Sequence, residues 1–230
     1  MLAGTVDRLS RRRAEGILII ATAALLAFYY AARADTIGVY SPARGWSPMT
    51  DPARPALLHF ALAALLLGVV PVLLTRLLSG RTLKELGLGL GDVRRGLALL
   101  AVGIPLAVLA GAVGAATPAV RAVYPLDPGA ASDHFVLYAT SQFLYFGAWE
   151  ALFRGVLLFG LRHRAGDAGA NAIQTALSVT AHFGRAINET FAALPAGLVF
   201  GWVSLRLRSI WYIAIIHWAV GVSLDWFILH

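Results

Sequence analysis

The chain has 230 residues, of which 59% are hydrophobic and only 13% are charged, whereas an ordinary water-soluble domain carries about 25% charged residues. This balance predicts an integral membrane protein and excludes a soluble domain. The net charge of +7 does not indicate nucleic-acid binding, because the arginines are spread along the chain. The absence of cysteine excludes disulfides, a thiolate nucleophile and a cysteine-based metal site.

The apolar pattern predicts an all-α, polytopic transmembrane helix bundle of about seven spans. The expected spans are residues 16–33, 55–78, 96–116, 134–161, 168–187, 190–206 and 209–229. No small-residue cleavage site follows the first span, which is therefore interpreted as a retained helix rather than a signal peptide. We expect a two-span N-terminal region, 1–78, and a membrane domain, 79–230. The pairs Ser41-Pro42, Ser47-Pro48 and Asp51-Pro52 are expected to break the first connection.

The distribution of basic residues predicts that the N-terminus lies inside. Thirteen would lie in inner segments: Arg8, Arg11, Arg12, Arg13, Arg76, Arg81, Lys84, Arg94, Arg95, Arg162, Arg164, Arg206 and Arg208. Five would lie in outer segments: Arg33, Arg44, Arg54, Arg121 and Arg185. This asymmetry favours an odd number of crossings, with His230 outside.

The segment 79–96 connects the second and third expected spans. Its GLGLG sequence is not read as a dinucleotide-binding loop, because no βαβ unit surrounds it. We expect instead a short interfacial helix, with Leu83, Leu86 and Leu88 toward lipid and Lys84, Arg94 and Arg95 toward headgroups.

Besides His59, which is alone in its span and is expected to pack, ionisable side chains fall deep within three later spans. They are Glu150 and Arg154, His182, and His217. A charge at this depth costs several kcal/mol unless it is paired or faces a polar cavity. At a rise of 1.5 Å per residue, Glu150, His217 and His182 lie about 18, 14 and 22 Å from the inner edge. They therefore share a middle layer, which indicates a site.

These residues allow either a structural or a chemical interpretation. Glu150 and Arg154 share one helix face and can form a neutralising ion pair, and each histidine alone could be a helix-packing residue. Together, a carboxylate can accept a proton, one imidazole can position water and another can stabilise an oxyanion. Nearer the outer side, Arg185 and Glu189 are expected to form a surface pair. Asp225 is expected to be either a solvated end group or a partner for Arg185.

The pattern resembles the CPBP (CAAX protease and bacteriocin-processing, Abi) family of glutamic-type intramembrane endopeptidases. The family pattern is Glu-Glu-x-x-x-Arg, then Phe-x-x-x-His, then His-x-x-x-Asn or Asp. The corresponding segments here are residues 149–154, 178–182 and 217–221. The segments LKELGLGLGDVRRG and GLVFGWVSLRLRSIWYIAIIHW are also similar, so that the resemblance covers about residues 79–230.

The sequence departs from the family at three motif positions. Trp149 replaces the first glutamate, which is the usual water-activating base of the family. Ser178 replaces the phenylalanine, and Gly221 replaces the residue that helps to hold the oxyanion. Glu150 matches the second glutamate, which the family ties to its arginine.

The resemblance implies an intramembrane endopeptidase that hydrolyses a peptide bond of a membrane-associated protein near the inner half of the bilayer. The expected catalytic residues are Glu150 as base, His182 holding water, His217 donating to the oxyanion and Arg154 orienting Glu150. No cofactor and no metal are expected, although two histidines and a glutamate are also a common zinc set.

Other functions remain open at this point. A catalytically inactive relative could serve as an accessory or assembly subunit of a larger membrane complex. His182 and His217 could be axial ligands of a haem or chlorophyll, and a transporter is a further alternative without an inverted repeat to support it. We expect membrane lipid and a membrane-associated protein or peptide as partners, no nucleic acid, and a bacterial inner membrane as the location.

Overall fold

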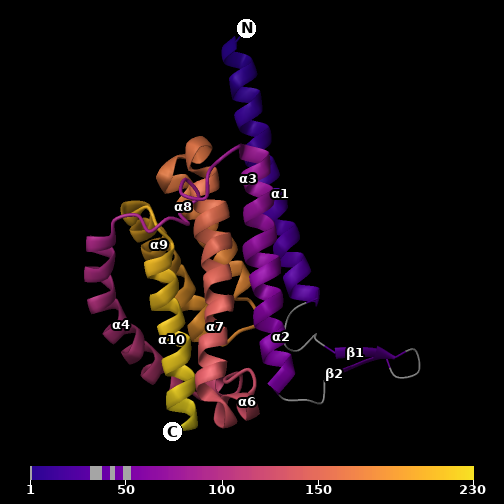
Figure 1. The fold of residues 1–230 in the computed structure, drawn as a ribbon, viewed down its shortest axis with the longest axis vertical. Coiled ribbons are helices and arrows are strands. Elements are labelled where there is room, and N and C mark those ends of the chain that lie inside the picture. Colours follow the sequence, from indigo (N-terminus) through magenta and orange to yellow (C-terminus); the bar gives the residue numbers. More distant parts are fainter. Residues whose placement is uncertain (1, 32–37, 42–44, 49–52) are drawn as a thin grey trace.

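The computed structural model describes residues 2–31, 38–41, 45–48 and 53–230, and the predicted helical fold class is confirmed (Figure 1). The helices are α1 (Leu2–Ala31), α2 (Ala53–Ala63), α3 (Val70–Ser79), α4 (Val93–Ala115), α5 (Pro118–Arg121), α6 (Pro128–Asp133), α7 (Phe135–Glu150), α8 (Gly160–Ala181), α9 (Ile187–Leu207) and α10 (Trp211–Leu229). Two segments are π-helical: η1 (Ala64–Val69) and η2 (Ala151–Phe159).

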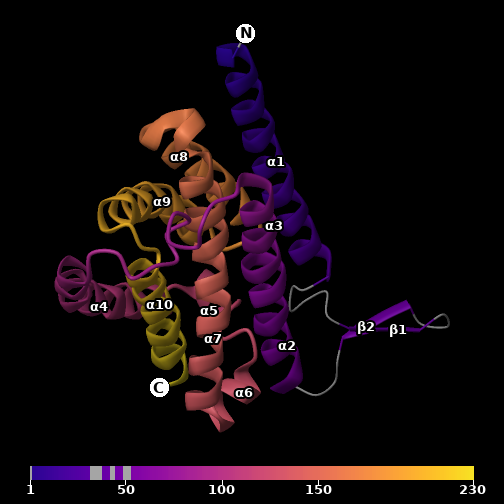
Figure 2. The ribbon, with the colours of Figure 1, turned by 45° about the horizontal axis from the view of Figure 1, so that its top comes forward.

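The first connection contains an antiparallel hairpin that the sequence did not predict. Its strands are β1 (Gly38–Ser41) and β2 (Gly45–Pro48), with Val39 opposite Ser47. The hairpin projects to one side of the helices in two views (Figures 1 and 2). Ser47-Pro48 thus ends a strand, whereas Pro42 and Asp51-Pro52, expected as breaks, lie outside the described residues, as do Arg33 and Arg44.

Within the described residues, six helices are long and apolar enough to cross a membrane, and the chain is a multi-pass integral membrane protein. They cover Arg11–Ala31, Ala56–Ser79, Val93–Ala115, Phe135–Ala181, Ile187–Leu207 and Trp211–Leu229. Large apolar side chains stand exposed along several of them, as lipid-facing surfaces require; Leu106, Leu109 and Val113 of α4 are examples.

The fourth of these helices has 47 residues and contains both the fourth and the fifth predicted span. It is broken at Gly166, whose φ of 70° and ψ of 170° are not helical. Trp149 and His182 lie almost equally far along the chain on either side of Gly166, yet their ring centroids are 5.2 Å apart. The chain therefore reverses at Gly166 and returns to the same depth.

The two termini lie at opposite ends of the helix bundle (Figure 1). This arrangement is what an odd number of crossings requires. The count of seven and the inside position of the N-terminus stay predictions.

The largest core cluster surrounds η2, whose nine residues are all buried. Leu152, Phe153 and Val156 of η2 share this cluster with Ile17 and Ala21 of α1. The core thus joins the two predicted regions, 1–78 and 79–230. It also holds η2 tightly in the centre, where Arg154 must lie.

The expected interfacial helix in 79–96 is wrong. Leu86 is fully buried in the core cluster rather than turned toward lipid. Gly87 and Gly91 have positive φ values of 76° and 57°, which turn the chain and prevent a helix. The segment is instead tied to the start of α10: the N–H of Ile210 donates to the Gly87 carbonyl at 2.9 Å, and the Trp211 indole donates to the Leu88 carbonyl at 2.9 Å.

Candidate functional site

Glu150 is the centre of a buried polar group built from α7, η2 and α10. Its side chain has no exposed surface, and Arg154 is only 2% exposed. Arg154 donates from a terminal guanidinium nitrogen to Oε1 of Glu150 at 3.2 Å, and its Nε lies 3.1 Å from Oε2. His217 Nδ1 lies 2.8 Å from Oε1. The predicted ion pair is therefore present, and it includes one of the predicted histidines.

The bond to Glu150 orients the ring of His217. An ionised carboxylate can only accept, so Nδ1 of His217 donates to it, and in the neutral form of the ring Nε2 has a free lone pair. Nε2 has no hydrogen-bond partner within the described part of the chain, and the ring lines a cavity. The arrangement presents an imidazole whose orientation is set by a buried carboxylate.

His182 comes to the same cavity from the other side. The sequence predicted that His182 lies within a helix, but it directly follows the last residue of α8. Its Nδ1 donates to the Ser178 carbonyl at 2.7 Å, and its ring meets the edge of Trp149. The lone pair of His182 is thus on Nε2 as well, so both imidazoles are poised to accept a proton or a water hydrogen.

The cavity has a volume of about 60 Å³, which is room for about two water molecules. His182, His217 and Trp149 line it, whereas Glu150 does not. The predicted base is thus separated from the cavity, and His217 connects the two. Within the described residues, no three His, Asp or Glu side chains are placed to share a metal ion.

The remaining wall contains polar residues that the sequence did not assign to the site. Tyr124, Gln142, Glu189 and Asp225 all line the cavity. The Tyr124 hydroxyl donates to Glu189 at 3.1 Å, and the amide of Gln142 donates to Asp225. Burial raises the pKa of Tyr124 well above its usual value, which keeps the phenol protonated and able to donate.

Two expectations near the outer side are corrected by these contacts. Asp225 is 1% exposed, so it is not a solvated end group, and the partner it accepts from is Gln142. Glu189 and Arg185, expected as a surface pair, both line the cavity instead. The position of Glu189 could not be predicted from the sequence, because it depends on Tyr124 of the connection 116–134 folding back against the beginning of α9. A buried carboxylate in an apolar helix, as at Asp225, was the one available hint.

Packing explains one of the three departures from the family pattern. A Cβ atom at Gly221 would overlap with the ring of Phe146, which in turn packs on His217 at 4.7 Å between centroids. The space of the family's Asn or Asp is therefore filled by an aromatic ring. The Trp149 indole similarly stands beside His182, where the family has its water-activating carboxylate.

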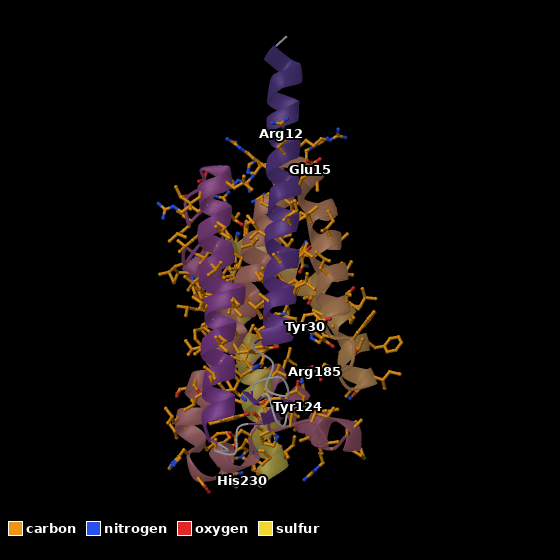
Figure 3. The ribbon with its side chains drawn as sticks, turned by 90° about the vertical axis from the view of Figure 1, so that its right-hand side faces the viewer. Arg12, Glu15, Tyr30, Tyr124, Arg185 and His230 are labelled. Carbon is orange, nitrogen blue, oxygen red and sulfur yellow. The ribbon has the colours of Figure 1, made fainter. Side chains whose placement is uncertain are left out.

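An apolar cleft of about 290 Å³ adjoins the cavity between α1 and α8. Both are lined by Tyr145, Trp149, His182, Arg185 and Glu189. Tyr124 and Arg185 lie in the half of the molecule that also contains His230, away from Arg12 and Glu15 (Figure 3). The cavity thus lies toward the end of the bundle that contains His230 (Figure 3).

Residues 133–223 match the model of the family described as Rce1-like, type II CAAX prenyl endopeptidase Rce1-like. No curated protein and no solved structure matches the chain. The matched segment contains Glu150, Arg154, His182 and His217, and over it the predicted resemblance to the CPBP family is confirmed. The family and the apolar helices together indicate an intramembrane protease-like protein.

Proposed function

We propose that the chain is a membrane-embedded endopeptidase of the Rce1-like type in which His217, rather than a glutamate, activates the attacking water. The observation that carries this proposal is the 2.8 Å contact between His217 Nδ1 and the buried Glu150, on a ring that also lines the cavity. A buried carboxylate that orients a histidine base is a recurrent arrangement in hydrolases.

The roles then differ from those expected for the family. Glu150 orients His217, and Arg154 pairs with Glu150 within the apolar core. His182 accepts a hydrogen bond from the same water and fixes its position. Arg185, a cation on the cavity wall, supplies positive charge near the carbonyl oxygen.

The proposed step is a general-base hydrolysis. Nε2 of His217 takes one proton from water while the oxygen bonds to the peptide carbonyl carbon, which forms a tetrahedral oxyanion. The resulting imidazolium returns that proton to the amide nitrogen as the C–N bond breaks. One water is consumed, and the carboxylic acid and amine that form leave as a carboxylate and an ammonium group after the acid proton passes to the amine.

The substrate class proposed is a membrane-associated protein or peptide, and the family description suggests a prenylated C-terminal sequence as the first probe. With the N-terminus inside, the cavity would lie in the outer half of the bilayer, not in the inner half expected from the sequence. A bacterial inner membrane, a larger complex and the absence of nucleic-acid partners stay predictions.

The test is hydrolysis of a quenched-fluorescence farnesylated CAAX peptide by the purified full chain in nanodiscs. We expect His217→Ala to lower kcat by about 10²–10⁴-fold, the usual contribution of a general base. Glu150→Gln should also lower kcat, and Glu150→Gln/His217→Ala should be no slower than His217→Ala alone, because the two act as a unit.

His134→Ala is the matched control, since His134 is an exposed histidine outside the cavity. It should retain the wild-type rate. A wild-type rate in His217→Ala, or fully additive losses in the double variant, would remove His217 from the base role.

One observation favours a second function, a non-catalytic accessory subunit. The cavity of about 60 Å³ is much smaller than a peptide segment. Under this alternative the wild type hydrolyses no membrane peptide, and a stoichiometric protein partner co-purifies from the native membrane. A monodisperse chain with His217-dependent hydrolysis contradicts it.

A further inference from the structure

A second concave site lies at the end of the bundle nearer the N-terminus, far from the cavity just described. It has a volume of about 700 Å³ and is formed by the 80–92 segment, the beginning of α8 and the end of α9. We call it the basic bowl. Its charged lining comprises five cations and two carboxylates: Lys84, Arg95, Arg162, Arg206 and Arg208 against Glu85 and Asp92.

The two carboxylates on the wall are already engaged. Glu85 accepts from the backbone N–H and the hydroxyl of Thr82, both at 2.8 Å, and these bonds lower its pKa. Asp92 accepts from the backbone N–H of Arg95 at 3.1 Å and pairs with its guanidinium at 3.5 Å. Asp92 is thus paired with a cation, whereas Glu85 keeps its negative charge because Thr82 is neutral; five cations against two carboxylates leave the lining with an excess of positive charge.

Three cations of the bowl have no acidic partner among the described residues: Lys84, Arg206 and Arg208. Arg162, by contrast, makes two hydrogen bonds to Asp167 at 2.9 and 3.2 Å. All three unpaired side chains are exposed, so their charge is directed at whatever enters the bowl. An anion is the ligand that such a site favours.

The surroundings favour a lipid anion over a free one. Phe159 and Leu207 add an apolar part to the lining. On α9, Leu198, Trp202 and Arg206 are spaced four residues apart and share one helix face, which runs from the bowl into the apolar part of the helix. Arg206 lies 5.0 Å above the Trp202 ring, and Trp202 and Leu198 are 54% and 43% exposed. Tryptophan and arginine at this position are typical of the headgroup level.

We propose that the basic bowl binds the headgroup phosphate of an anionic phospholipid, with an acyl chain lying along Leu198 and Trp202. The predicted inside position of the N-terminus would place the bowl in the cytoplasmic leaflet, where anionic lipids attract juxtamembrane cations. The proposal does not depend on catalysis.

The test uses the delipidated full chain in nanodiscs of phosphatidylcholine with and without phosphatidylglycerol, with bound lipid counted by native mass spectrometry. The bowl variant is Lys84→Gln/Arg206→Gln/Arg208→Gln. We expect it to lose at least about 10-fold in apparent phosphatidylglycerol affinity, since each cation near a membrane surface contributes to attraction of anionic lipid.

The matched control is Arg12→Gln/Arg13→Gln/Arg76→Gln, which removes three exposed cations outside the bowl. It should bind phosphatidylglycerol like the wild type. Equal losses in both triple variants would show unspecific surface attraction and overturn the proposal. If inorganic phosphate binds the delipidated chain as tightly as phosphatidylglycerol does, the bowl is a free-anion site and the lipid proposal is overturned. If the bowl triple variant is misfolded, Lys84→Gln alone is measured, and unchanged affinity counts against the site.

Discussion

At the scale of single residues, Arg154 illustrates why a charge can persist in the middle of an apolar bundle. It is enclosed by the π-helical segment η2, paired with Glu150 and placed 5.6 Å above the ring of Phe200. Neither charge could be left alone there, because an unpaired buried ion is far more costly than the pair.

We predict that Arg154→Met lowers the free energy of unfolding by about 3–5 kcal/mol, because Glu150 would lose its buried counter-ion. Glu150→Gln/Arg154→Met should recover more than half of that loss. Denaturant titration in mixed micelles measures both. Arg162→Met is the comparison, since its exposed pair with Asp167 should contribute only about 0–1 kcal/mol. Equal costs for the two single variants would contradict this account.

The sequence predicted which charged side chains lie in the centre better than it predicted their contacts. The spacing of Glu150 and Arg154 on one helix face was sufficient to predict their pairing. That His217 would join the pair, while the lone pair of its other nitrogen was left for the cavity, depends on the packing of α10 against α7. No periodicity in either segment reports that packing. The same is true of Phe146, which fills the space beside Gly221.

At the scale of elements, the segment between α3 and α4 fixes how α9 and α10 meet the rest of the molecule. The N–H of Asp92 donates to the Leu207 carbonyl at 2.9 Å, and the Tyr212 hydroxyl donates to the Leu90 carbonyl at 2.8 Å. Arg81 donates to the carbonyls of Phe159 and Gly160 at 2.7 and 2.6 Å, at the end of η2. Burial lowers the pKa of Arg81, and the two carbonyl groups accept hydrogen bonds from its guanidinium.

Gly91 is the residue on which this junction depends. Its φ is +57°, and a Cβ atom there would overlap with the Leu207 carbonyl oxygen. Gly80 also has a positive φ, +72°, but its Cβ would meet nothing within 4 Å. We predict that Gly80→Ala costs about 1–2 kcal/mol for the left-handed backbone alone. Gly91→Ala should cost a further ~1–3 kcal/mol from the overlap.

The same denaturant titration separates the two glycine variants, and indistinguishable unfolding free energies would contradict the proposed role of Gly91. The sequence identified this segment as a linker but assigned it a helix. The pattern of leucines that suggested an amphipathic surface instead serves to bury Leu86, because alternate glycines release the backbone from any regular period.

At the scale of the whole molecule, hydropathy and the distribution of arginines were enough for a multi-pass bundle and for most helix ends. They also separated the fourth and fifth spans, which are two helices that meet at Gly166, although they could not place the break at that residue. Nor could they predict the β1–β2 hairpin, which lies outside the bundle.

The predicted orientation can be tested directly, because the sequence contains no cysteine. We expect a membrane-impermeant thiol reagent to label His230→Cys in intact cells and to label Arg12→Cys only after permeabilisation. Figure 3 shows these two positions at opposite ends of the molecule. Labelling of both positions in intact cells would contradict an odd number of crossings, and the reverse pattern would place the N-terminus outside.

The reversal at Gly166 constrains how this protein can vary. Trp149 and His182 meet from two helical arms of similar length on either side of Gly166. Deletion of one residue from either arm would turn the end of that arm by about 100° and shift it by about 1.5 Å. His182 would then face lipid or a neighbouring helix instead of its indole partner. Residues can therefore be added or removed freely only at the tip around Gly166, or as matched changes in both arms. The turn is the place where a reporter or a tag could be inserted with the central chemistry undisturbed.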